Sequence, residues 1–165
     1  MTDFGAAFRA GQTAAAKAQR AKEQITEVLE AVARDLTEAT EGKLTIYEAE
    51  LGSFATTVFA AAQSLNTLSG KTDPAPIKER SIFAKNLLAI DSSSIRLARW
   101  SVPHSGFPCI LGYSGQDVRC HDRSGLEAAF VDLLKDAWVG DQLGRLLARE
   151  TSDSIQFEDD VDNAS

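Results

Sequence analysis

The residues most able to do chemistry lie in one short segment, CILGYSGQDVRC, which runs from Cys109 to Cys120. It holds two cysteines and a serine between glycines, and it has His104 a few residues before it and His121 directly after it. Cysteine and histidine can bind zinc, two cysteines can form a disulfide, and a serine or a thiolate can attack a carbonyl. Each of these chemistries requires a particular spacing.

The spacing does not suit a zinc site or a serine hydrolase. Cys120 and His121 are neighbours, and neighbouring side chains on a strand point to opposite faces of the sheet, so only a bulge could bring both to one metal ion. A hydrolase nucleophile turn needs G-x-S-x-G between a strand and a helix. Around Ser114 the second glycine comes one place early. No phosphate-binding loop, EF-hand or paired-cysteine finger occurs, so we expect no metal and no cofactor.

The segment is better explained as a β-hairpin whose turn is Ser114-Gly115. That register places Cys109 opposite Cys120, and it gives the hairpin one mostly apolar face and one mostly polar face. Both cysteines fall on the apolar face, where free cysteine is commonly buried. We expect two buried free thiols, because the N-terminus does not read as a signal peptide and a reducing cytoplasm is the expected compartment. A cysteine-dependent enzyme that uses Cys109 and His104 is kept as an alternative.

Residues 1–41 are predicted to form one long helix, because they contain no proline and are rich in helix-forming residues. Apolar or small residues recur on a seven-residue repeat, at Phe4, Ala7, Ala14, Ala18, Ala21, Ile25, Val28 and Val32. The bulky half, Ile25 to Leu36, is expected to pack on the rest of the chain. Small side chains let helices approach closely, so the other half suggests oligomerisation through Ala7, Ala14, Ala18 and Ala21. Glycine in Glu41-Gly42-Lys43 is expected to end the helix.

Residues 43–121 are predicted to form a mostly antiparallel sheet of about six strands in three hairpins, because β-branched and aromatic runs alternate with turn residues. The first hairpin joins KLTIYEAEL to SFATTVFAAA. The second joins SIFAKNLLAI to IRLARWSV, with Ile90 opposite Ile95. The third is the cysteine segment.

Helices are expected after the sheet. Ser124 and Glu127 have the spacing of a capping box, and an apolar stripe at helical spacing continues to Trp138. A short helix over DQLGRLLARE follows. Both are predicted to pack on one face of the sheet. The fold class is therefore α+β, with a long helix over 1–41, an α+β domain over 43–149 and an acidic tail over 150–165.

The net charge of −7 is unevenly distributed. Residues 1–22 carry four basic and one acidic side chain, and residues 23–50 carry two basic and eight acidic ones. Residues 51–149 carry eleven basic and nine acidic side chains, whereas residues 150–165 carry six acidic and no basic ones. The body is almost neutral, so direct nucleic-acid binding is not expected. No apolar run approaches the roughly 18 residues of a membrane span.

The tail is polar and acidic and is expected to be disordered. Two apolar residues, Ile155 and Phe157, stand directly before a group of acidic ones. These acidic residues are Glu158, Asp159, Asp160 and Asp162. One hypothesis is a short binding motif in which the apolar pair enters a groove and the carboxylates meet a basic rim; the other is a solubilising end.

The leading functional hypothesis is a non-catalytic module that binds another protein, one of basic charge, through its acidic segments. An immunity protein, antitoxin, inhibitor or secretion chaperone would fit. The contacts are expected from the tail and from Glu23, Glu27 and Glu30 in the long helix. A structural or assembly subunit that oligomerises through the N-terminal helix is the alternative of another class.

Overall fold

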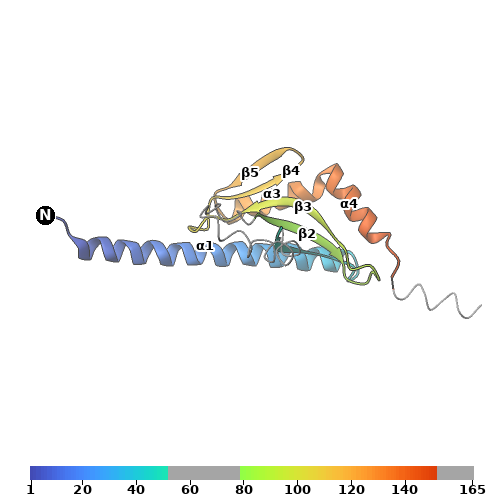
Figure 1. Ribbon diagram of the computed structural model, residues 1–165, viewed down its shortest axis with the longest axis horizontal. Coiled ribbons are helices and arrows are strands. Elements are labelled where there is room, and N and C mark those ends of the chain that lie inside the picture. Colours follow the sequence, from blue (N-terminus) through green and yellow to red (C-terminus); the bar gives the residue numbers. More distant parts are fainter. Residues whose placement is uncertain (52–78, 152–165) are drawn as a thin grey trace, which may run out of the picture.

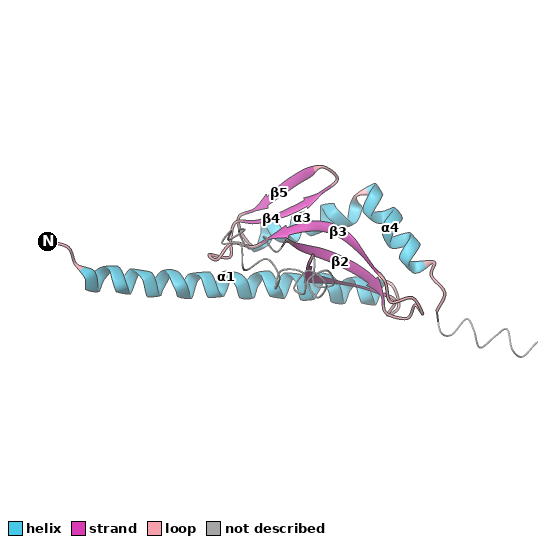
Figure 2. Cartoon of the chain, viewed as in Figure 1, coloured by secondary structure: helices cyan, strands magenta, loops and turns pink. Residues whose placement is uncertain are grey.

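The chain folds as a long helix, an antiparallel sheet and two further helices (Figures 1 and 2). The computed structural model describes residues 1–51 and 79–151. In order, its elements are α1 (Phe4–Ala39), β1 (Leu44–Glu50), β2 (Arg80–Asn86), β3 (Ser94–Ser101), β4 (Cys109–Tyr113), β5 (Gln116–Cys120), α3 (Arg123–Lys135) and α4 (Ala137–Leu147). The α+β class predicted from the sequence is confirmed.

The described sheet has five strands in the order β1-β2-β3-β4-β5, and each strand is antiparallel to the next. In this sheet β1 pairs with β2, from Leu44 opposite Asn86 to Glu50 opposite Arg80. The predicted partner of β1 in a first hairpin, SFATTVFAAA, lies outside the described residues. About six strands were expected, and the part of the chain that is described forms five.

The hairpin of β4 and β5 has the predicted register. Cys109 lies opposite Cys120, and the pairing continues to Tyr113 opposite Gln116. Ser114 and Gly115 both have positive φ, 48° and 76°, which is the backbone geometry of the two-residue turn that matches strand twist. The turn and the alternation of apolar and polar residues agree, so local sequence is enough to set this register.

The predicted register of the second hairpin is wrong. Ala84, not Ile90, lies opposite Ile95, and β2 ends at Asn86. The cause is the buried Asn86 amide, whose Oδ1 accepts hydrogen bonds from the backbone N–H groups of the next turn and whose Nδ2 donates to the carbonyl of Leu146 at 2.8 Å. A buried amide needs these partners, and satisfying them ends the strand early.

The chain stays in contact with the domain beyond α4. Beyond Arg149, the carbonyl of Glu150 accepts a hydrogen bond from the Ile90 N–H at 3.1 Å. Ala89 and Thr151 then form an antiparallel bridge. The chain is therefore held to the loop after β2 as far as Thr151, the last described residue.

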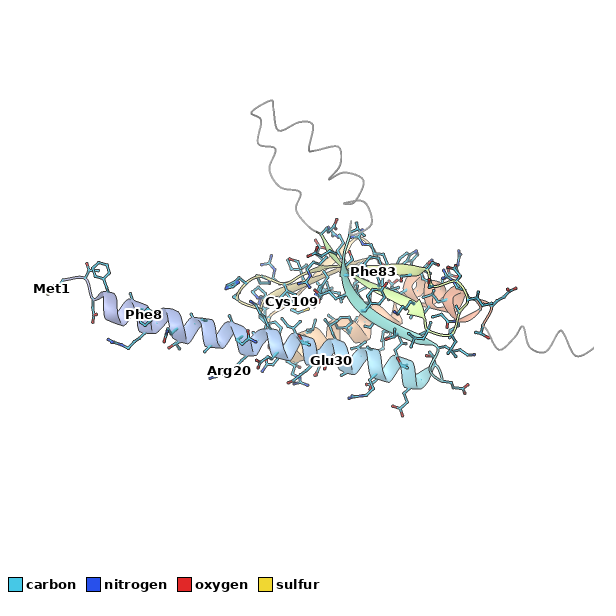
Figure 3. All side chains as sticks on the ribbon, turned by 60° about the horizontal axis from the view of Figure 1, so that its bottom comes forward. Met1, Phe8, Arg20, Glu30, Phe83 and Cys109 are labelled. Carbon is cyan, nitrogen blue, oxygen red and sulfur yellow. The ribbon has the colours of Figure 1, made fainter. Side chains whose placement is uncertain are left out.

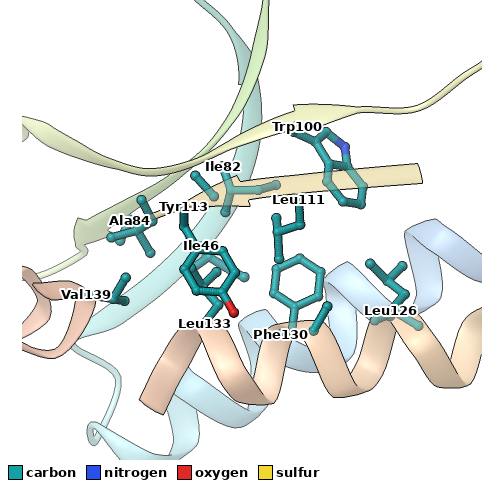
Figure 4. Packing of buried hydrophobic residues seen from close by; sticks show 14 of the residues in the cluster. Ile46, Ile82, Ala84, Trp100, Leu111, Tyr113, Leu126, Phe130, Leu133 and Val139 are labelled. Carbon is teal, nitrogen blue, oxygen red and sulfur yellow. The ribbon is translucent and has the colours of Figure 1, made fainter. Parts of the chain in front are cut away.

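The core lies between one face of the sheet and the helices (Figure 4). The sheet contributes Ile46, Ile82, Trp100 and Leu111, which face Phe130 and other apolar residues of α3. The rings of Trp100 and Phe130 have centroids 6.1 Å apart. Both C-terminal helices join this single cluster, as predicted.

The second half of α1 packs against this core. Ile25 and Val28 are buried, and Leu29, Val32 and Leu36 are partly buried against the same cluster. These positions recur every three or four residues, so one side of the helix faces the domain. The predicted intramolecular packing of the Ile25 to Leu36 half is confirmed.

The two helices that follow the sheet begin at residues other than those predicted. Asp122 caps α3 by accepting a hydrogen bond from the Gly125 N–H at 2.7 Å, so Ser124 lies inside the helix and makes no capping box. Glu127 instead pairs with Arg123 at 3.0 Å. The helix also stops at Lys135, before the predicted Trp138, because the next aspartate caps α4. A residue with a short polar side chain can end one helix and start the next.

That aspartate, Asp136, joins α4 to the β4–β5 turn. Its carboxylate accepts hydrogen bonds from the backbone N–H groups of Trp138 and Val139, at 3.0 and 3.2 Å, and from the Ser114 hydroxyl at 2.9 Å. The Val139 N–H, then Ser114, hold the pKa of this carboxyl below its usual value. These hydrogen bonds favour the ionised form.

The lowered pKa of Asp136 makes stability depend on pH. The contribution of the carboxylate is present above its ordinary pKa of 3.8 and is lost as the pH falls through the lower folded-state value. We expect the wild type to lose its advantage over Asp136→Asn, measured by urea unfolding, between about pH 6 and pH 2.5. A difference between the two proteins that stays constant over this range would contradict the assignment.

The loop between β3 and β4 fixes where α1 leaves the domain. Gly106 has a φ of 88°, and a Cβ placed on it would lie 2.5 Å from the Ala21 Cβ. Only glycine allows this approach, since any side chain would collide with α1 and strain the backbone. The contact of Gly106 with Ala21 therefore holds the helix near its midpoint.

Gly106→Ala is expected to destabilise the protein by about 2–4 kcal/mol, because overpacking adds to backbone strain. Gly115→Ala is the matched control: Gly115 also has positive φ, 76°, but open space where its Cβ would lie, so it should cost only about 1 kcal/mol. Urea unfolding of both variants measures the difference. Equal losses of unfolding free energy in the two variants would show that the close contact of Gly106 with Ala21 adds nothing to the cost of the substitution.

Candidate protein-binding surface

The two cysteines lie in the core. Cys109 and Cys120 face each other across β4 and β5 as free thiols, and both are buried. The hydrogen bond to Cys120, together with burial, raises the pKa of Cys109 far above its usual value. A thiol is nucleophilic as its thiolate, so Cys109 is poorly suited to attack a substrate, and burial keeps a substrate away from both thiols.

The histidines do not complete a site around these thiols. His104 lies exposed in the β3–β4 loop, and His121 is exposed although its neighbour Cys120 is buried. Within the described ranges, no three histidine, cysteine or acidic side chains are arranged to hold a metal ion. The geometry thus lends no support to a cysteine enzyme that uses Cys109 and His104.

Both thiols are expected to react with iodoacetamide at least about 100-fold more slowly in the folded protein than in denaturant, because labelling must wait for opening. Arg119→Cys supplies a matched control: it adds a thiol beside Cys120 on the exposed face of the same strand, and this third thiol should label fast. Rapid labelling of a native cysteine would revive the enzyme hypothesis.

The first half of α1 projects from the domain as an arm, defined here as residues 4–17 (Figure 1). Every residue of this arm is exposed, and at 1.5 Å per residue it is about 20 Å long. Phe4 and Phe8 near its tip are 79% and 65% exposed. An isolated helix of this length is marginal in water, so a bound partner would stabilise it.

The alanines predicted to mediate oligomerisation are divided between the arm and the domain. Ala7 and Ala14 are exposed on the arm, whereas Ala18 and Ala21 are partly buried. Ala21 lies against Gly106 of the same chain. The predicted stripe is therefore accessible only in its first part.

The acidic side chains predicted to bind a partner lie along the exposed side of α1, and we call Glu23, Glu27 and Glu30 the acidic ridge. All three are exposed and fall three or four residues apart, so they share one side of the helix. Glu23 accepts a hydrogen bond from Gln19 at 3.1 Å, and Glu27 pairs with Arg123 of α3 at 2.7 Å. The side chain of Glu30 makes no ion pair or hydrogen bond with a described residue.

The remaining predicted binding residues, Ile155, Phe157, Glu158, Asp159, Asp160 and Asp162, lie outside the described residues. The structure adds Phe8 to the exposed residues that could bind a partner, although Phe8 is not one of the seven-residue-repeat positions. Its signal in the sequence is the spacing of four residues from Phe4, which places both rings on one side of a helix.

None of the protein-family models, curated proteins or solved structures compared with the chain matches it. Among the described residues, no helix is both long enough and apolar enough to span a bilayer.

Proposed function

We propose that this protein is a non-catalytic binding module that sequesters or chaperones a basic protein partner on the exposed side of α1. The observation that carries the proposal is the projection of α1, a single helix that is exposed at every residue of the arm and keeps an exposed acidic side where it packs on the domain. A partner can therefore contact this helix on more than one side. In the reducing cytoplasm, the proposed compartment, the two buried thiols would stay reduced.

The charge along α1 supports a basic partner. Residues 23–50 carry two basic and eight acidic side chains, and the acidic ridge is exposed. Complementary charge accelerates encounter and selects partners, and its effect weakens with salt. The acidic tail, with the Ile155 and Phe157 motif, is proposed as a second point of attachment.

A second candidate function is a structural or assembly subunit that associates through the arm. The exposure of Phe4 and Phe8 favours it, because large aromatic side chains are enriched at protein interfaces and contribute strongly to binding there.

Co-purification from the native host at low salt tests the first candidate, with bound proteins identified by mass spectrometry. We expect one stoichiometric basic protein that binds wild type and is lost with the double variant Glu23→Gln and Glu30→Gln. This variant keeps the ion pair of Glu27 with Arg123, so the contact of α1 with α3 stays intact. Binding should also fall steeply as salt is raised.

The matched control is Asp132→Asn with Asp141→Asn, which removes two exposed carboxylates from α3 and α4 and should leave binding unchanged. A chain truncated after Thr151 measures the share of the tail and keeps the bridge to Ala89. If binding is unchanged both in the Glu23→Gln and Glu30→Gln variant and at high salt, the proposed surface is ruled out.

A further inference from the structure

A groove of about 400 Å³ lies between the second half of α1 and α3. Its walls are mostly apolar and include Val28, Val32 and Leu36 of α1 and Phe130, Val131 and Leu134 of α3. Val131 is 49% exposed. A groove with such walls suits aromatic or aliphatic side chains.

The groove also has an acidic border. Asp35 and Glu127 are among its lining residues, and both carboxylates are more than half exposed. Asp35 already pairs with Arg34 at 3.4 Å, and Glu127 already pairs with Arg123 at 3.0 Å. This half of α1 is still acidic, because residues 23–39 carry five acidic side chains and one basic one. A basic ligand with apolar anchors would match both properties.

The arm has these complementary properties. Phe4 and Phe8 lie one helical turn apart on the same side of α1, and Arg9 follows directly. Residues 1–22 carry three more basic than acidic side chains. The tip therefore presents two aromatic anchors beside a positive charge.

The arm cannot reach the groove of its own chain. Phe8 and Val28 belong to one unbroken helix, so the 20 residues between them hold them about 30 Å apart. Figure 3 shows Phe8 on the projecting part and Glu30 beside the domain. The arm that fills this groove must come from another molecule.

We propose that the arm of a second copy of this chain docks in the groove, with Phe4 and Phe8 against the apolar walls and Arg9 near the carboxylates. If the exchange is reciprocal, each chain gives an arm and receives one, and the assembly closes as a dimer with twofold symmetry. The inference rests on the second candidate function, association through the arm, and it specifies where the arm binds.

Sedimentation velocity of the full-length protein over a wide concentration range tests the proposal. We expect a dimer, and we expect Phe4→Ala with Phe8→Ala to raise its Kd at least about 30-fold, as loss of a hot spot does. Val131→Glu should weaken it similarly by placing a charge in the groove. Leu87→Ala with Leu88→Ala is the matched control, because these two leucines are exposed and line neither the groove nor the arm, so the Kd should not change.

Mixing the arm variant with the groove variant is the sharper test. Each is expected to be monomeric alone, whereas the mixture keeps one intact arm and one intact groove and should form a heterodimer. Circular dichroism of each variant checks that it is folded. A dimer that survives the arm variant, or a mixture that gives no heterodimer, overturns the proposed docking.

Other outcomes separate this inference from the proposed functions. If the wild type is a monomer, both the docking and the second candidate function are overturned. Capture of a basic partner through the acidic ridge is tested by the co-purification and does not depend on the docking. A monomer whose Phe4 and Phe8 bind phosphatidylserine vesicles would assign the arm to a lipid surface instead and would equally overturn the docking.

Discussion

The structure depends on the burial of one side of α1, at Ile25 and Val28, against the sheet and α3. Burying two such side chains stabilises the fold by about 1.5–3 kcal/mol each. Because a helix is stiff, fixing its second half also fixes the direction of its first half. The projection of the arm therefore follows from the packing of residues that are not part of it.

Gly106 determines where this packing ends. Its missing side chain lets the β3–β4 loop approach Ala21, and all residues of α1 before Ala18 are exposed. The same helix is thus partly core and partly free surface. The two parts also differ in charge, with a basic arm followed by the acidic ridge, while residues 51–149 carry only two more basic than acidic side chains. Binding in this protein is therefore proposed for α1 and for the surfaces beside it.

The residues that suggested catalysis serve the core instead. Cys109 and Cys120 face each other in a hairpin whose inner side packs on α3. Both are small enough to lie opposite each other beneath a helix, and both are buried. In the structure this segment is a β-hairpin that contributes both cysteines to the core.

Local interactions are sufficient to determine several features from the sequence alone. The β4–β5 register follows from a two-residue turn and from the division into one mostly apolar and one mostly polar face, and the length of α1 follows from uninterrupted helix-forming residues ended by Gly42. The acidic ridge could be predicted too, because helical spacing places its members on one side. In each case the deciding residues are close together in the sequence.

Tertiary contacts decided the rest. β2 ends at Asn86 because its amide donates a hydrogen bond to the carbonyl of Leu146, sixty residues later. The groove is formed by α1 and α3, whose pairing no local pattern specifies. Where two local solutions differ little in energy, the one that satisfies buried polar groups and fills the core prevails. The sequence by itself thus determines the elements and their exposed charges, and only the fold determines which surfaces remain free.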